Sequence, residues 1–328
     1  MPSRVTSRDV ARAAGVSQNT VSLVIHDSPR VRPETKATVR AAMKRLGYHP
    51  NAVAAALRTQ STPVLLFVVR KSTVHDHVTA ELLAGAIEGA EHFGDSVLVI
   101  AVDAGARLAV NAFHAGWASG SLVFAVEPND RVVTELTAAG CPTVSLLQPS
   151  TDCPPEYLVH ADDAGGARQA IAHLLERGHT RIGLVTARLE PDAEGPAFQR
   201  TRAAWEAAQA GGATLVPAYT AAWTTEGGLR AGRELLQSSP RPSAIFAISD
   251  RAAFGVLQAA REAHLRVPED MAVVGFDDTE WARYCDPPLT TVEFPLRTIG
   301  RLGAERLLGG TPTDLTPVPT RLIVRQSS

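Results

Sequence analysis

Apolar positions in the first fifty residues follow helical spacing in three short stretches. They predict helices near residues 7–14, 18–25 and 33–46, with Gly15 and Gly47 at helix ends. Serine or threonine precedes the first two helices, and proline opens the third. Because a tight turn separates the first two helices, this segment predicts a helix-turn-helix with a small core closed by the third helix.

Beyond residue 60, continuous apolar runs alternate with amphipathic helical stretches in a βαβα rhythm. Such runs are typical of parallel strands covered by helices on both faces. Two series of about a hundred residues each predict two similar α/β lobes with doubly wound sheets. The predicted strands lie near 64–69, 97–102, 122–126, 144–147, 158–160, 182–186, 244–248 and 271–276, and the predicted helices near 81–92, 131–139, 164–177, 198–210, 225–237 and 252–264.

Charge is distributed unevenly along the 328 residues. Residues 1–60 carry ten Lys and Arg against three acids, a net +7, while the remainder carries a net −9, so the overall −2 hides a basic module on an acidic body. A small basic module predicts a polyanionic partner. The 45% apolar content is that of an ordinary folded protein.

Several classes of protein are disfavoured by what the chain lacks. Three scattered cysteines give no disulfide framework, and no apolar stretch suits export or a membrane span, so we expect a cytoplasmic protein without a membrane partner. We find no phosphate-binding glycine loop and no catalytic motif, and we expect no enzyme activity, cofactor or metal. His75-Asp76-His77 could in principle hold a metal, but a solvated loop is the simpler interpretation.

In a helix-turn-helix the second helix enters the major groove of DNA. The amides of Gln18 and Asn19 can pair bidentately with adenine, and Thr20 and Ser22 can contact phosphates or bases. The alternative is a solvated helical bundle, because this pattern alone has false positives.

Polar residues that follow the apolar runs of the body are the candidates for ligand binding. In parallel sheets, ligands bind at the carboxyl ends of the strands. Carboxylates can accept hydroxyl hydrogen bonds from a polyhydroxylated solute, and Trp223 offers a stacking face. The competing interpretation is that these residues are helix caps or solvent groups, Asp250 and Asp278 in particular. The candidates are Asp162, Ser249, Asp250, Asp277 and Asp278, with Arg70 and Lys71 after the first strand.

The segments SRDVARAAGVSQNTVS (7–22), RPET (32–35) and LGYHPNAVA (46–54) resemble the DNA-binding headpiece of the LacI/GalR family of bacterial transcription regulators. The resemblance implies a hinge helix over Asn51–Arg58 that orders on the operator, with Leu57 wedged into the minor groove. An alanine-rich spacer is the alternative for this segment. Leu23 and His26 stand where the family more often has Arg and Asn. The implied DNA contacts are Thr6, Ser17, Gln18, Asn19, Thr20, Ser22, Asn51, Ala54 and Leu57.

The resemblance extends through the body, in LLERGHTRIG (174–183), PEDMAVVGFDD (268–278) and PLTTV (288–292). It implies a periplasmic-binding-protein-like body. Carried over residue by residue, the implied effector contacts are Asp162, Arg200, Trp223, Ser249 and Asp277, with Arg202 as an alternative to Arg200. Val78 and Thr79 stand opposite the family's usual aromatic pair, so the effector is not identified.

The resemblance also implies a domain organisation. We expect a headpiece over 1–50, a hinge helix and linker over 51–60, and an effector-binding and dimerisation domain over 61–328. Within that domain, lobe 1 takes about 61–160 plus the segment after residue 291, and lobe 2 about 162–290. The sequence ends without leucine heptads, which favours a dimer.

These features together predict a transcription regulator, expected to be a repressor. It would bind a palindromic operator in double-stranded DNA as a homodimer and respond to a small-molecule effector, a sugar or sugar derivative, between the lobes. A solute-binding protein for transport is one alternative; the absent export signal and the basic module disfavour it. The other is a sugar- or nucleoside-modifying α/β enzyme fused to a DNA-binding module.

Overall fold

The computed structural model describes residues 5–25, 28–48, 63–125, 130–150, 152–187, 195–220, 223–309 and 316–328. The chain divides into two compact units, residues 1–62 and 63–328, each of which is described by itself. No helix in these ranges is long and apolar enough to cross a membrane.

The first unit is a three-helix headpiece that confirms the predicted helix-turn-helix. Its helices are α1 (Ser7–Ala14), α2 (Gln18–Ile25) and α3 (Pro33–Leu46). Thr6 and Asp9 form a capping box at the start of α1, and Gly15 ends that helix in the left-handed conformation that glycine adopts without strain. One small apolar core holds the three helices together: Val10, Ala11, Val21, Val24, Val31, Val39 and Ala42.

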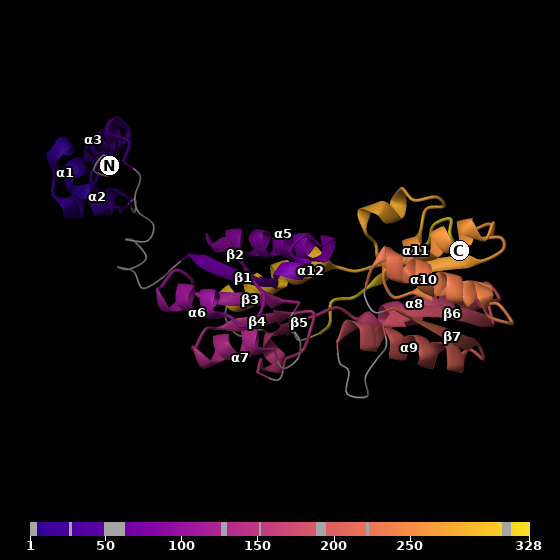
Figure 1. Cartoon of the computed structure of the whole chain (residues 1–328). Coiled ribbons are helices and arrows are strands. Elements are labelled where there is room, and N and C mark those ends of the chain that lie inside the picture. Colours follow the sequence, from indigo (N-terminus) through magenta and orange to yellow (C-terminus); the bar gives the residue numbers. More distant parts are fainter. Residues whose placement is uncertain are drawn as a thin grey trace. The chain divides into compact units, whose positions relative to one another are not determined.

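The second unit contains two parallel-stranded layers, as predicted (Figure 1). The first sheet has the order β2-β1-β3-β4-β5. Helices α5 and α12 pack on one face of this sheet and helices α6 and α7 on the other. Its elements are β1 (Val64–Arg70), α5 (His77–His92), β2 (Ser96–Val102), α6 (Arg107–His114), β3 (Gly120–Phe124), α7 (Arg131–Ala138), β4 (Thr143–Leu146) and β5 (Leu158–Val159), with short 3-10 turns at Lys71–Thr73 and Pro155–Tyr157.

The second sheet has the order β11-β10-β9-β8-β6-β7. Helices α8 and α9 pack on one of its faces and helices α10 and α11 on the other. Its elements are α8 (Asp163–Glu176), β6 (Arg181–Ala187), α9 (Pro196–Ala210), β7 (Thr214–Thr220), α10 (Thr225–Gln237), β8 (Ala244–Ala247), α11 (Asp250–Glu262), β9 (Ala272–Asp277), the 3-10 turn η3 (Glu280–Arg283), β10 (Thr290–Glu293) and β11 (Arg321–Ile323). Helix α12 (Leu296–Leu308) lies between β10 and β11 in the chain but packs on the first sheet.

The segment after Thr291 divides between the lobes, whereas we expected all of it in lobe 1. Helix α12 does pack against α5 and the first sheet, but β11 pairs antiparallel with β10 at the edge of the second sheet. The pairing satisfies backbone groups that an edge strand would otherwise leave exposed. The carboxyl end of the chain therefore belongs to the second lobe.

Strand β7 has no counterpart among the predicted strands. Its sequence, TLVPAYT, is interrupted by Pro217 and leaves Tyr219 half exposed, so it lacks the continuous apolar run of a central strand. It is the edge strand of its sheet, a position that tolerates proline.

Glycines allow two pairs of helices to touch backbone to backbone. A Cβ on Gly300 of α12 would lie 2.0 Å from the carbonyl oxygen of Leu82 in α5, and a Cβ on Gly85 would lie 1.9 Å from that of Arg297. A Cβ on Gly228 of α10 would likewise lie 2.1 Å from the carbonyl oxygen of Ala252 in α11. Any larger side chain at these positions would push the helices apart.

Candidate functional site: a headpiece surface and a buried arginine cluster

Two of the predicted DNA contacts have clear structural roles in the headpiece turn. Thr6 caps α1, and the hydroxyl of Ser17 accepts a hydrogen bond from the backbone N–H of Thr20 at 3.0 Å. The hydroxyls of Ser17 and Thr20 also lie 2.8 Å apart. Sequence analysis anticipated both caps; their DNA contacts remain predictions.

The amino-terminal end of α2 presents neutral polar side chains to solvent. Gln18 and Asn19 are exposed and Ser22 is half-buried, whereas Val21 and Val24 are buried in the core. The structure therefore leaves the predicted base-reading side chains accessible. The predicted contacts Asn51, Ala54 and Leu57 lie outside the described residues, as does His26.

A buried arginine joins three elements at the carboxyl-end edge of the second sheet. Nε of Arg200, in α9, donates to Oδ1 of Asp163 at 2.6 Å, and Nη1 donates to the carbonyl oxygen of Ile248 at 2.7 Å. Nη1 also donates to Oδ1 of Asp277 at 3.2 Å. Only 3% of the Arg200 side chain is exposed, so these charges are held largely away from water.

Aromatic rings surround the same guanidinium group. Its carbon lies 3.7 Å from the ring centroid of Phe276, 4.6 Å from that of Phe294 and 5.6 Å from that of Trp223. Cation–π attraction is strongest where the cation is desolvated. The rings and carboxylates thus fix Arg200 while Trp223 keeps 38% of its surface exposed.

Burial dominates the protonation of both carboxylates in this arginine cluster. It raises the pKa of Asp277 to about 6, although the charge and hydrogen bonds of Arg200 oppose the increase. Burial likewise raises the pKa of Asp163 against the lowering effect of Arg200. Protons are therefore held more strongly here than on exposed carboxylates.

The structure brings together three of the predicted effector residues: Arg200, Trp223 and Asp277. Arg202, the alternative arginine, is exposed and pairs with Glu206 at 2.8 Å on the surface of α9. Sequence analysis missed Asp163, although it directly follows Asp162. Its position at the start of a helix suggested at most a cap, and only the fold shows its contact with Arg200.

The other two predicted effector residues are helix caps in the structure. Oδ1 of Asp162 accepts from the backbone N–H of Gly165 at 2.7 Å, and Oγ of Ser249 accepts from that of Ala252 at 3.2 Å. Asp162 retains 44% side-chain exposure and lines a cavity of about 580 Å³ together with His160 and Arg202. Ser249 is buried.

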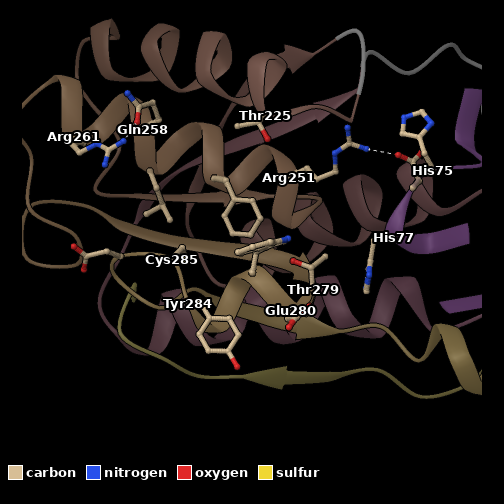
Figure 2. Close-up of a pocket in the computed structure, with 15 residues that line it drawn as sticks. His75, His77, Thr225, Arg251, Gln258, Arg261, Thr279, Glu280, Tyr284 and Cys285 are labelled. Carbon is tan, nitrogen blue, oxygen red and sulfur yellow. Dashed lines mark hydrogen bonds and ion pairs between the residues drawn. The ribbon is translucent and has the colours of Figure 1, made fainter. Parts of the chain in front are cut away.

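A cavity of about 740 Å³ lies between the lobes beside the Asp76–Arg251 ion pair, in which Nη1 and Oδ1 are 2.8 Å apart (Figure 2). Asp76 precedes α5 and Arg251 is in α11, so the pair links the two lobes. The residues 75–77 contribute to the rim, but the described part of the chain contains no group of His, Cys, Asp and Glu arranged to hold a metal ion.

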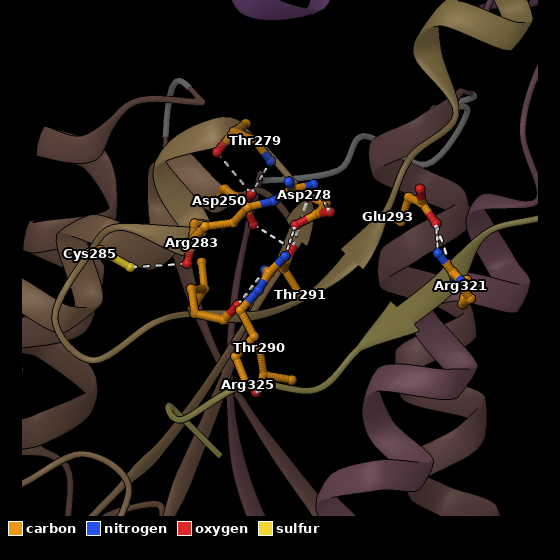
Figure 3. Close-up of polar contacts among 12 residues, drawn as sticks. Asp250, Asp278, Thr279, Arg283, Cys285, Thr290, Thr291, Glu293, Arg321 and Arg325 are labelled. Atoms are coloured by element: carbon orange, nitrogen blue, oxygen red, sulfur yellow. Dashed lines mark hydrogen bonds and ion pairs between the residues drawn. The ribbon is translucent and has the colours of Figure 1, made fainter.

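A third buried carboxylate, Asp250, fastens the end of β9 to α11 (Figure 3). Its Oδ2 accepts from the backbone N–H of Thr279 at 2.7 Å and from the Thr279 hydroxyl at 3.0 Å, and its Oδ1 accepts from the hydroxyl of Thr291 at 2.5 Å. A Cβ on Gly275 would lie 2.4 Å from Oδ1 of Asp250, so glycine makes room for it. The alternative interpretation of Asp250 as a helix cap or solvent group does not describe its role, because its carboxylate joins α11 to Thr279 and Thr291.

Asp278 is held differently from its neighbour Asp277. It accepts from Nη2 of Arg325 at 2.6 Å, and a second arginine, Arg283, lies at 3.6 Å (Figure 3). The pair ties the end of β9 to the carboxyl-terminal segment. Asp278 therefore has a structural role in the second lobe.

A basic helix-turn-helix unit and a two-sheet, ligand-binding type of body define a class of transcription regulators. Residues 6–51 match the model of the family described as "Bacterial regulatory proteins, lacI family". Residues 171–328 match the model of the family described as "Periplasmic binding protein-like domain". The chain is 34% identical to the HTH-type transcriptional regulator CelR of Thermobifida fusca, over 98% of this chain and 96% of that protein.

Two further comparisons also cover nearly the whole chain. The ribose operon repressor of Escherichia coli K12 is 32% identical over 92% of each chain. A crystal structure of the lac repressor dimer bound to operator and the anti-inducer ONPF has a TM-score of 0.85 at 28% identity, covering 99% of both chains. The chain belongs to the LacI family. It is a transcription regulator and not an enzyme.

Proposed function

We propose that this regulator represses transcription by binding a palindromic operator as a homodimer, and that a sugar or sugar-derived effector bound between its lobes controls the binding. The observation that carries the effector assignment is the buried Arg200 cluster, at the sheet edge where parallel α/β folds bind ligands. A DNA-bound protein of this kind works in the bacterial cytoplasm, which is where we expect this chain.

The headpiece supports the DNA-binding part of the proposal. Gln18 and Asn19 are exposed at the start of α2, and residues 1–60 carry a net charge of +7 that suits a phosphate backbone. The similar lac repressor was crystallised as a dimer on its operator. Two-fold symmetry in the protein matches two-fold symmetry in the DNA.

The arginine cluster supports the effector part. Asp277 can accept hydroxyl hydrogen bonds, Arg200 can donate to ring or hydroxyl oxygens, and the partly exposed face of Trp223 can stack on the apolar face of a sugar. A solved structure of a similar transcriptional regulator, CelR, is a complex with cellobiose. Asp162 and Ser249 remain proposed contacts that would act from their capping positions.

Selection of sites from random duplex DNA by the full-length protein tests the DNA-binding part. A palindromic motif is the expected result, and enrichment of none, with and without a panel of sugars, would refute the proposal. Leu57→Gly in the hinge segment should abolish binding to the selected site while leaving the dimer intact on gel filtration. Unchanged affinity would remove the proposed minor-groove wedge.

Titration calorimetry against mono- and disaccharides tests the effector part. Asp277→Ala should weaken binding of the sugar that binds the wild type, whereas Arg233→Ala, which removes a surface ion pair between α10 and Glu262, is the matched control and should not. Equal affinity in Asp277→Ala would exclude the cluster as the binding site. Operator affinity measured with and without that sugar then gives the sign of the coupling between the two ligands.

A further inference from the structure

The helix that we propose enters the major groove carries no charged residue. Helix α2 reads QNTVSLVI, so the hydrogen bonds with which it reads base edges must come from amides and hydroxyls. Leu23 packs against the headpiece core and offers no hydrogen bond to a base. Base reading by α2 therefore depends on a few neutral side chains, and the orientation of each amide matters.

Gln18 is connected to the neighbouring helix by its side chain. Nε2 of Gln18 donates a hydrogen bond to Oγ of Ser7 at 2.8 Å, across eleven residues of sequence. Ser7 is the first residue of α1, and the cap of that helix is supplied by Thr6 and Asp9 rather than by Ser7. The Ser7 hydroxyl is thus available for this contact.

We propose that Ser7 is a positioning residue that makes Gln18 a reader of adenine; the inference depends on the proposed DNA-binding function. Ser7 accepts one of the two amide hydrogens of Gln18. One N–H and the carbonyl oxygen Oε1 remain, which is the donor and acceptor pair that matches N7 and the N6 amino group of adenine. Guanine presents two acceptors, N7 and O6, at that edge, and would need both amide hydrogens.

Phosphate binding comes from other parts of the headpiece. In the described part of this unit, the basic side chains lie on α1, on α3 and in the segment between α2 and α3, including Arg8, Arg32 and Lys44. Loss of the Ser7 hydroxyl removes no charge. It should therefore change base preference without changing the dependence of affinity on salt concentration.

The experiment compares wild type, Ser7→Ala and Ser7→Thr in site selection, followed by titration of the selected operator and of its adenine-to-guanine variants. Ser7→Ala should lose about five- to tenfold of the adenine preference at one base pair in each half-site, as expected for part of one bidentate contact. Ser7→Thr, which keeps the hydroxyl, should retain the preference. Thr38→Ala is the control, because the exposed Thr38 hydroxyl donates only to the backbone carbonyl oxygen of Glu34 within α3.

Other results would overturn the inference. An adenine preference in Ser7→Ala equal to that of wild type would show that Ser7 does not orient Gln18. An equal loss of affinity for all sites, with a smaller salt dependence, would mean that Ser7 contacts phosphate instead. If the wild type selects no motif, the proposed DNA-binding function fails first, and the inference falls with it.

Discussion

Asp250 is a buried carboxylate that forms no ion pair with the described residues, and Asp250→Asn tests what that burial costs. Burial, reinforced by the negative charge of Asp277, raises the pKa of Asp250 from 3.8 to about 8 against the opposing effect of hydrogen bonds from Thr291 and Thr279. The folded state therefore holds a proton that the unfolded state releases near pH 4. This contribution to stability is complete at low pH and is lost as the pH rises through the window to about 8.

The size of the effect follows from linkage. One proton held only by the folded state changes the free energy of unfolding by about 1.4 kcal/mol per pH unit, so the wild type should lose up to about 4 kcal/mol between pH 5 and pH 8 from this group. Asn keeps an oxygen that accepts from the N–H of Thr279 and carries no charge. Asp250→Asn should match the wild type within about 1 kcal/mol at pH 5 and exceed it at pH 8.

Urea unfolding of the full-length protein at both pH values measures this difference. His173 and His179, whose pKa values are lowered by burial, are the same in both proteins, so their contributions cancel in the comparison. Asp270→Asn is the control, because hydrogen bonds from Arg266 hold the pKa of Asp270 far below this window. A stability difference between Asp250→Asn and wild type that is the same at pH 5 and pH 8 would refute the reasoning.

Three other substitutions test the packing and charges of the second unit. Arg200→Met leaves two buried carboxylates without their cation and should lower the free energy of unfolding by about 3 to 5 kcal/mol; a loss below 1 kcal/mol by urea unfolding would mean that water already solvates them. Gly300→Ala forces a methyl group against the backbone of Leu82 and should cost about 3 kcal/mol in the same assay; a neutral result would contradict the close approach of α5 and α12. Arg251→Gln breaks the partly exposed pair with Asp76 and should cost less than about 1 kcal/mol; a loss above 2 kcal/mol would show that the pair holds the lobes together more strongly than its exposure indicates.

Local sequence determined the elements of this protein almost completely. The three headpiece helices were predicted because their caps, glycine stops and apolar spacing are encoded within a few residues, and the central strands because they are continuous apolar runs. The edge strand β7 was missed because a strand paired on one side needs no such run. Helix α12 and strands β10 and β11 were likewise not predicted individually.

Tertiary structure decided what local patterns could not. The contact of Arg200 with Asp163 and Asp277 joins residues 37 and 77 positions apart, and no local spacing distinguishes Arg200 from the exposed Arg202. Caps and ligand contacts also use the same residue types at helix starts, so the sequence could not separate the capping roles of Asp162 and Ser249 from binding. Local order depends on neighbours within a few residues, whereas a buried charge is stable only where distant elements bring its partners, and those partners are set by the packing of the whole domain.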